Sequence, residues 1–255
     1  MKKIITAIII ATVSISIASA QASFGVKAGF NSSTYVIGVE KVSSTVNLGN
    51  NPGFYFGGQA SIPVSDIFAF QPELVYSYDG TKLGIKGSLL KDMGAPPSYT
   101  KDLAASLNMH NINIPLLFKL SPSESLGIMA GPYVSYSIEY KANFNKNLKK
   151  LIETDGGIPT GPILDTIEEL MKDNLNKLNV GLSFGAEYVF DSGFFIEARY
   201  NLGLLNTLKK EVNLEGVGIE FEEGVFTSSW EDLIEAPVQP KLKYQSFQIG
   251  IGYRF

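Results

Sequence analysis

Residues 246–255 read SFQIGIGYRF, and this stretch decides the fold class. Apolar side chains occupy every second position, and the residues between them are small, polar or charged. The apolar set is Phe247, Ile249, Ile251, Tyr253 and Phe255. A helix would scatter these side chains around its axis, whereas a β-strand places alternate residues on opposite faces. The C-terminus is therefore predicted to be a strand with one apolar face.

The same two-residue period occurs in seven earlier stretches. They cover residues 24–31, 54–62, 68–78, 111–119, 126–139, 180–190 and 194–203. With the C-terminal stretch they predict eight strands of about ten residues, which is long for a soluble sheet and matches tilted strands that cross a membrane. Three of these stretches contain a proline, which marks a place where a β-bulge could shift the register. These prolines are Pro72, Pro115 and Pro132.

The connections between these strands alternate in length. Three are tight turns rich in Pro, Gly, Asp and Ser, at residues 63–66, 121–124 and 191–193. The other four are long, near residues 36–51, 80–106, 141–179 and 206–242. This alternation is typical of outer-membrane barrels, which have short periplasmic turns and long extracellular loops. The predicted fold is all-β: an eight-stranded antiparallel up-and-down transmembrane β-barrel with both chain ends on the short-turn side.

Two of the long loops carry patterns of their own. In the third, apolar residues recur at steps of three and four, which predicts one loop helix that packs on other loops or caps the barrel mouth. These residues are Ile163, Ile167, Leu170, Met171, Leu175 and Leu178. The fourth loop is rich in glutamate, and the alternation of Val217, Ile219 and Phe221 predicts a strand extension above the membrane. In the same loop, Trp230 would anchor a partner or fill a small loop core.

The first twenty residues are predicted to be a secretory signal peptide. Lys2 and Lys3 form its positive start, an apolar region follows to Ile17, and residues 18–20 (ASA) supply small side chains for cleavage. An uncleaved anchor helix is the alternative, but the apolar stretch is shorter than the roughly 20 residues that a span requires. The predicted division is a signal peptide at 1–20 and one outer-membrane β-barrel domain at 21–255.

Composition excludes several other classes of protein. The chain has no cysteine, so disulfides, thiolate chemistry and lipid attachment through an N-terminal cysteine are ruled out. A net charge of −4 without a basic patch makes it a poor binder of nucleic acid. The loop carboxylates show no calcium-loop pattern, so they are expected to be a solvated face, and no metal or cofactor is predicted. Beyond residue 20, no apolar run reaches the length of a membrane helix.

Alternation alone does not say which face points to lipid. A soluble lipocalin-like ligand carrier also alternates, with its apolar face inward. Here the polar face is rich in glycine, as the crowded interior of an eight-stranded barrel requires, and aromatic residues gather near the strand ends, as in membrane-interface girdles. The chain also stops on Phe255, in phase with the apolar face. The sequence therefore favours a membrane barrel, which places the protein in the outer membrane as an integral component.

The two ends of the predicted barrel carry a family resemblance. The stretches SFGVKAGFN at 23–31 and FQIGIGYRF at 247–255, after a signal peptide, resemble the PorT-like outer-membrane β-barrel domain family. The resemblance covers nearly the whole predicted domain, in pattern more than in diagnostic residues. It implies a small barrel, and for some members a role in protein secretion; no catalytic motif comes with it. The terminal Tyr253 and Phe255 resemble the signal that the barrel-insertion machinery reads.

Charged side chains on the polar face are the main candidate site residues. The cations are Lys27, Lys119, Arg199 and Arg254, and the anions are Glu73, Glu139, Glu187 and Glu197. A charge inside a narrow barrel needs a partner, so these side chains are expected to form an interlocking network of ion pairs. Such a network would plug the lumen, and the alternative interpretation is a selective pore.

The only histidine, His110, stands just before the fourth strand at the loop side. With Ser106 and an acid it would form the rim constellation of a lipid-modifying enzyme, but no spacing specifies one, so no catalytic residue is predicted.

The leading hypothesis is a non-enzymatic barrel that acts through its extracellular loops, in surface interaction, adhesion or envelope integrity. The alternative is an accessory component of an outer-membrane secretion or assembly complex. Expected partners are outer-membrane lipid, the insertion machinery, and an extracellular or envelope protein bound by the loops.

Overall fold

The computed structural model describes residues 22–37, 47–85, 102–155, 157, 159–209 and 242–255. The predicted signal peptide at 1–20 lies outside these described residues, as do Val217, Ile219, Phe221 and Trp230.

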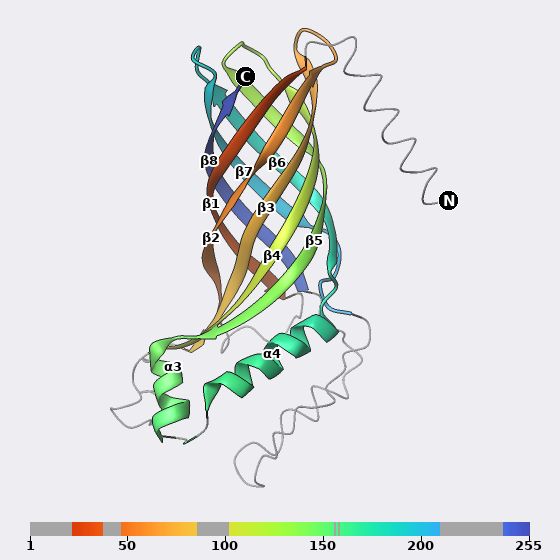
Figure 1. The fold of residues 1–255 in the computed structure, drawn as a ribbon. Coiled ribbons are helices and arrows are strands. Elements are labelled where there is room, and N and C mark those ends of the chain that lie inside the picture. The colour runs from red at the N-terminus through yellow and green to blue at the C-terminus, as the bar shows by residue number, and fades with distance from the viewer. Residues whose placement is uncertain (1–21, 38–46, 86–101, 156, 158, 210–241) are drawn as a thin grey trace.

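Eight antiparallel strands close into one barrel in sequence order (Figure 1). The strands are β1 (Ser23–Ile37), β2 (Asn47–Pro63), β3 (Phe68–Ile85), β4 (Leu103–Leu120), β5 (Leu126–Phe144), β6 (Leu178–Val189), β7 (Phe194–Gly203) and β8 (Leu242–Arg254). Each strand pairs with the next, and β1 pairs with β8 from Gly25↔Arg254 to Ile37↔Leu242, which closes the ring. The predicted eight-stranded up-and-down barrel is confirmed.

The two faces of the barrel differ in polarity as the alternation predicts. Large apolar side chains are exposed on the outer face of every strand; Phe30 of β1 is 79% exposed and Ile251 of β8 is 64% exposed. The inner face is mostly polar, with Glu197 and Arg199 of β7 buried. An apolar surface of this extent is unfavourable in water and favourable in lipid, where a closed barrel satisfies its backbone groups. The soluble lipocalin-like alternative, which requires an apolar interior, is therefore wrong.

The two ends of the barrel also differ. Short turns join β2 to β3, β4 to β5 and β6 to β7, and the C-terminus lies at this same turn end (Figure 1). In the third turn Gly193 has a φ of 85°, a left-handed conformation that favours glycine. At the opposite, loop end, the connections are shorter than predicted because β3 and β4 stay paired as far as Ile85↔Leu103.

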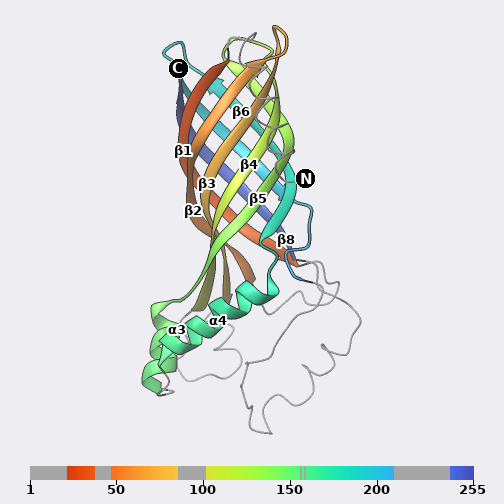
Figure 2. The ribbon, with the colours of Figure 1, turned by 45° about the vertical axis from the view of Figure 1, so that its right-hand side comes forward.

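The connection between β5 and β6 contains helical segments. It consists of α3 (Lys146–Lys150), the π-helical turn η2 (Leu151–Asp155) and α4 (Thr160–Asn174). α4 matches the predicted loop helix, whereas Leu178, expected on that helix, begins β6. The pattern does not predict α3 and η2, because five residues are too few to show a helical period. In Figures 1 and 2, α3 and α4 lie beyond the loop end. Among the described residues, the helices lack the length and apolarity needed to cross a bilayer.

The apolar stripe of α4 packs on the barrel wall. Met171, which is 8% exposed, belongs to a cluster that joins α4 to β1, β4, β5 and β8. The buried members are Tyr35, Met109, Tyr140 and Met171, and Leu107, Ile167, Leu175, Leu242 and Tyr244 pack against them. The backbone N–H of Ala142 also donates to Glu168 Oε1 of α4 at 2.9 Å. α4 is therefore a cap over the loop end of the lumen.

Met171→Ser is expected to release this cap while the barrel stays folded. The change removes a buried apolar side chain, at a local cost of about 2 kcal/mol. Limited proteolysis should then cut residues 146–174 faster than in the unmodified protein, while the band shift between heated and unheated protein on a gel is retained. Lys172→Ser, at the exposed neighbouring position, serves as the control and should leave the cleavage rate unchanged. Equal rates for both variants would contradict docking through Met171.

Two register shifts interrupt the strand pairing, one between β2 and β3 and one between β4 and β5. Neither falls at the three prolines named in the sequence: the register runs unchanged past Pro72, Pro115 and Pro132. The first shift, between Asn50 and Phe54, spans Pro52, which the sequence pattern did not single out. Proline lacks only the N–H of the ladder and does not require an extra residue in the strand. In the second shift, His110 pairs with Glu139 while Asn111 pairs with Ser137, so Ile138 is the additional residue.

Candidate functional site: the polar lumen

Four charged side chains form an ion-pair layer across the middle of the lumen. Arg199 binds Glu73 through two N–H groups, with N–O distances of 2.6 and 3.0 Å, and reaches Glu197 at 3.0 Å. Lys27 Nζ lies 2.7 Å from Glu73 and 3.2 Å from Glu197. The exposed fraction of each of these side chains is 0–2%. Two cations and two anions thus neutralise one another away from water.

The barrel topology brings these residues together from distant parts of the chain. Lys27 belongs to β1, Glu73 to β3, and Glu197 and Arg199 to β7. β3 and β7 are four strands apart in a ring of eight, so their inner faces oppose each other. Because an eight-stranded barrel is barely wider than its own side chains, long charged residues meet across it. We name this group the central layer.

Neutral side chains complete the central layer. Tyr55 Oη donates to Glu197 Oε1 at 2.7 Å, and Gln71 Nε2 donates to Glu73 Oε1 at 2.9 Å. Both donors are fully buried. The additional hydrogen bonds satisfy carboxylate lone pairs that the cations leave free, which a buried ion pair requires for stability.

A second cluster lies at the turn end. Glu187 Oε1 accepts from Lys119 Nζ at 2.9 Å and from Arg254 Nη2 at 2.7 Å. The Arg254 guanidinium lies 5.8 Å from the ring centroid of Phe195, a cation–π contact. Gly252 makes room for that ring, because a Cβ at this position would lie 2.2 Å from Phe195 Cζ.

Glu139 is not part of the lumen, in contrast to the prediction. Its side chain is 51% exposed on the outer face, 3.3 Å from Lys141 Nζ and 3.8 Å from His110 Nε2. The physical reason is the additional residue Ile138, which reverses the facing of β5 beyond it. Strict alternation does not reveal such a shift.

Asp79 is a buried lumen acid that the sequence analysis did not single out. It is 2% exposed and belongs to β3, in phase with Glu73 and Ser77, so extending the alternation by one step would have found it. Asn31 Nδ2 and Tyr244 Oη donate to its Oδ1 at 2.7 and 2.8 Å. Oδ2 accepts from Asn111 Nδ2 at 2.8 Å and from the Ser77 hydroxyl. All four donors are neutral.

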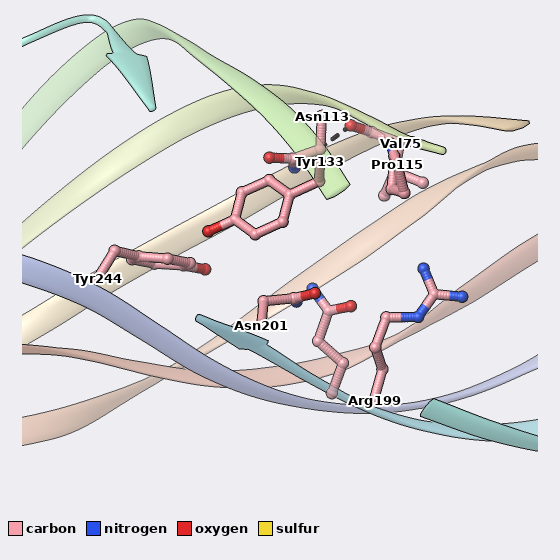
Figure 3. A pocket seen from close by; sticks show the side chains of 8 residues that line it. Val75, Asn113, Pro115, Tyr133, Arg199, Asn201 and Tyr244 are labelled. Atoms are coloured by element: carbon pink, nitrogen blue, oxygen red, sulfur yellow. Dashed lines mark hydrogen bonds between the residues drawn. The ribbon is translucent and has the colours of Figure 1, made fainter. Parts of the chain in front are cut away.

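Between the central layer and Asp79 lies a cavity of about 20 Å³. Figure 3 shows Tyr133 pointing toward Tyr244 across it, with Arg199 at its other end. Arg199 Nε and Tyr133 Oη are buried there without a hydrogen-bond partner. The volume holds about one water molecule, which would pair with these groups. Within the part of the lumen that the structure describes, side chains fill the interior and leave a space far smaller than a solute channel.

The C-terminal residues lie on the outer face at the turn end. Tyr253 is 40% exposed and Phe255 is 69% exposed. The backbone of Phe255 exchanges two hydrogen bonds with Phe24, at 2.8 and 3.2 Å, which extends the pairing of β1 and β8 to the last residue. The role of these aromatics as an insertion signal stays a prediction.

His110 lies on the outer face of β4 among aromatic residues. Its Nδ1 is hydrogen bonded to the Tyr76 hydroxyl, and its ring packs edge-on against Tyr78 at a centroid distance of 5.0 Å. Ser106 is four residues further along the strand, about 13 Å away. Aromatic side chains such as Tyr76 and Tyr78 on the outer face near the loop end are typical of an interface girdle.

His110→Ala is therefore expected to leave the lipid A profile of an expressing strain unchanged, since the contacts of this imidazole among the described residues are Tyr76, Tyr78 and Glu139 and include no serine hydroxyl. Mass spectrometry of extracted lipid A measures the outcome. Tyr76→Phe is the control, because it removes the other half of the hydrogen bond. Loss of an acyl group or gain of one that depends on His110 alone would contradict the structural role.

A closed ring of eight strands, an apolar outer surface and a filled, charged interior define an integral membrane β-barrel. The chain belongs to the outer membrane protein beta-barrel domain family, whose model matches residues 18–209. It is an integral protein of the outer membrane.

Several solved outer-membrane proteins are similar to the chain at low identity. Neisserial surface protein A is 10% identical, with 92% of this chain and 99% of that chain covered and a TM-score of 0.44. OprG from Pseudomonas aeruginosa is 11% identical, with 92% and 97% covered and a TM-score of 0.45. Ail, the attachment invasion locus protein of Yersinia pestis, is 10% identical, with 92% and 99% covered and a TM-score of 0.37. No curated protein sequence matches the chain.

Proposed function

We propose that this protein is a non-enzymatic outer-membrane barrel that acts through its extracellular loop end, in surface interaction, adhesion or envelope integrity. The main support for this proposal is that side chains fill the described part of the lumen. The central layer, the Glu187 cluster and the α4 cap occupy the described interior, and the cavity beside Arg199 holds only about one water. Transport through this lumen would require those buried ion pairs to separate. The surface left for recognition is the loop end, where loops on a rigid scaffold usually bind.

The α3–α4 segment supports a binding role of this end. Asn145 caps α3 by accepting from the N–H of Leu148 at 2.9 Å, and the side-chain amides of Asn145 and Asn147 donate to the Asp102 carbonyl at 2.9 and 3.0 Å. These contacts tie α3 to the start of β4, while the Met171 cluster fixes α4. An ordered platform of this kind loses little conformational entropy when it binds a partner.

The test compares the unmodified protein with a variant whose residues 146–174 are replaced by a Gly/Ser linker. A strain that lacks the protein is complemented with each version, and adherence to immobilised extracellular matrix and sensitivity to vancomycin are measured. The unmodified protein should restore the affected property and the linker variant should not. The heat-dependent band shift shows that the shortened barrel still folds. Full rescue by the linker variant, or ion conductance of the unmodified protein in planar bilayers, would overturn the proposal.

The resemblance of residues 23–31 and 247–255 to the PorT-like family favours a second candidate function. Under it, the protein is an accessory component of an outer-membrane secretion or assembly complex. Crosslinking followed by affinity purification from membranes separates the two. Stoichiometric envelope proteins that remain with the linker variant would support the assembly role, because the contact would then lie outside the loop platform.

A further inference from the structure

A second cavity lies in the lumen nearer the loop end, between Tyr244 and the segment that follows α4. Its volume is about 20 Å³, room for one water-sized species. Hydroxyl and amide side chains from both the barrel wall and the loop cap line it. We name it the capped cavity. Tyr244 separates it from the cavity beside Arg199, since this residue lines both.

Two tyrosines at the capped cavity direct their protons elsewhere. Tyr35 Oη donates to Met109 Sδ at 3.2 Å, and Tyr244 Oη donates to Asp79 Oδ1 at 2.8 Å. A hydroxyl has one proton and two lone pairs. Each tyrosine therefore has only lone pairs left for the cavity.

Two amide side chains and a serine at the cavity also donate their protons to other groups. Asn111 Nδ2 donates to Asp79 at 2.8 Å, and Asn176 Nδ2 donates to backbone carbonyls after β7 at 3.0 and 3.1 Å. Ser137 Oγ donates to Asn111 Oδ1 at 2.7 Å, which leaves lone pairs on both oxygens. At the capped cavity, the oxygens of Tyr35, Tyr244, Asn111 and Ser137 can therefore act only as acceptors.

Two further oxygens at this cavity have no partner in the part of the chain that the structure describes. They are Thr207 Oγ1 and Asn179 Oδ1. Thr207 is 5% exposed, so water outside the barrel does not reach it. A buried, unpaired oxygen is unfavourable unless a donor or a cation occupies the space beside it.

The net charge near the capped cavity also favours a cation. Asp79 forms a salt bridge with none of the described lysines and arginines, and its four donors are neutral. The central layer lies about 20 Å away along β3, counted from Glu73 to Asp79, and its own charges cancel. Asp79 does not line the capped cavity, but it binds Asn111 and Tyr244, which do. Ionised Asp79 therefore leaves one negative charge directly behind the cavity wall.

We propose that the capped cavity binds one monovalent cation of the size of Na⁺, held by neutral oxygens of Tyr35, Asn111, Asn179 and Thr207 and balanced in charge by Asp79. Hard cations bind oxygen ligands, and a single uncompensated carboxylate matches one positive charge rather than two. A water molecule has two protons and satisfies at most two of these oxygens as a donor, whereas a cation is bound by all four at once. The ion joins the barrel wall, at Tyr35, Asn111 and Asn179, to the segment after β7, at Thr207.

The test measures the unfolding temperature of the full barrel in detergent micelles, in NaCl and in choline chloride of equal concentration. At a sodium concentration ten times the Kd, the midpoint should be roughly 3–6 °C higher in NaCl. Asp79→Asn removes the charge with little change in shape, and Thr207→Val removes one oxygen. Both variants should lose most of the sodium-dependent shift while keeping the heat-dependent band shift of a folded barrel.

Ser183→Ala is the matched control. Its hydroxyl is also fully buried and unpaired, but it does not line the capped cavity, so the sodium-dependent shift should match that of the unmodified protein. Equal midpoints of the unmodified protein in the two salts would mean that the cavity holds water only and would overturn the proposal. A full sodium shift in Thr207→Val would do the same, and this variant decides the matter if Asp79→Asn does not fold.

Discussion

Arg199→Met is expected to lower the free energy of unfolding by about 3–5 kcal/mol, because it leaves a buried charge uncompensated. The guanidinium binds both Glu73 and Glu197, and no more than 2% of its side chain is exposed. Without it, Lys27 alone faces two carboxylates in a lumen with no room for bulk water. Methionine keeps most of the packing volume, so the decrease in the free energy of unfolding measures the loss of the charge. Urea titration of the protein in micelles, followed by the heat-dependent band shift, measures it.

The same substitution at Arg254 is the control. That side chain is 19% exposed, and its partner Glu187 keeps Lys119 at 2.9 Å. Lys119 still balances the buried carboxylate, and the space left by the partly exposed Arg254 is open to water, so Arg254→Met should cost only about 1 kcal/mol. Equal losses for the two variants would show that the central layer contributes no more than a partly exposed pair.

Gly29→Ala is expected to prevent normal closure of the barrel between β1 and β8. A Cβ at Gly29 would lie 2.2 Å from the carbonyl oxygen of Ile249 and 2.6 Å from Gly250 Cα. Both atoms belong to the backbone, so no side chain can rotate away, and overpacking of this kind costs about 3 kcal/mol or more. The fraction of protein that shows the heat-dependent band shift after refolding should fall sharply.

Gly58→Ala is the matched control, because it adds the same methyl group to a neighbouring strand away from the pairing of β1 with β8. Gly58 lies on β2 on the outer face, and the nearest atom to an added Cβ is the Gly25 carbonyl oxygen at 3.8 Å. The same methyl group should therefore change the folded fraction little. A Gly29→Ala protein that refolds as completely as Gly58→Ala would mean that β1 and β8 can separate to accept a side chain.

The strand pattern was predictable because the two faces of a strand meet different surroundings. In β8, Phe247, Ile249 and Ile251 face lipid, whereas Ser246 and Gln248 face the lumen. The apolar residues are thus on the lipid side and the polar residues on the inner side. The same reasoning places Lys27, Glu73, Glu187, Glu197 and Arg199 inside the barrel. Their inward position follows from the two-residue alternation of polarity, which can be read from a single sequence.

The partners of these residues were not predictable from period. Whether Arg199 meets Glu73 or Glu187 depends on which strands face each other across the ring and on the stagger between them, and both depend on closure. Asp79 and Glu139 show the limit most clearly. One additional residue, Ile138, turns Glu139 outward, and the acid that lies in the lumen nearer the loop end is Asp79 instead.

The sequence by itself thus determined that this chain forms eight alternating strands with short and long connections. The reason is that each strand residue faces either lipid or the lumen, and its polarity matches the side that it faces. Only the tertiary structure decided which charges pair, where the register shifts and how α4 covers the lumen. Those features arise from contacts between residues that are far apart in the chain, as between Glu73 and Arg199, and such contacts exist only once the ring has closed.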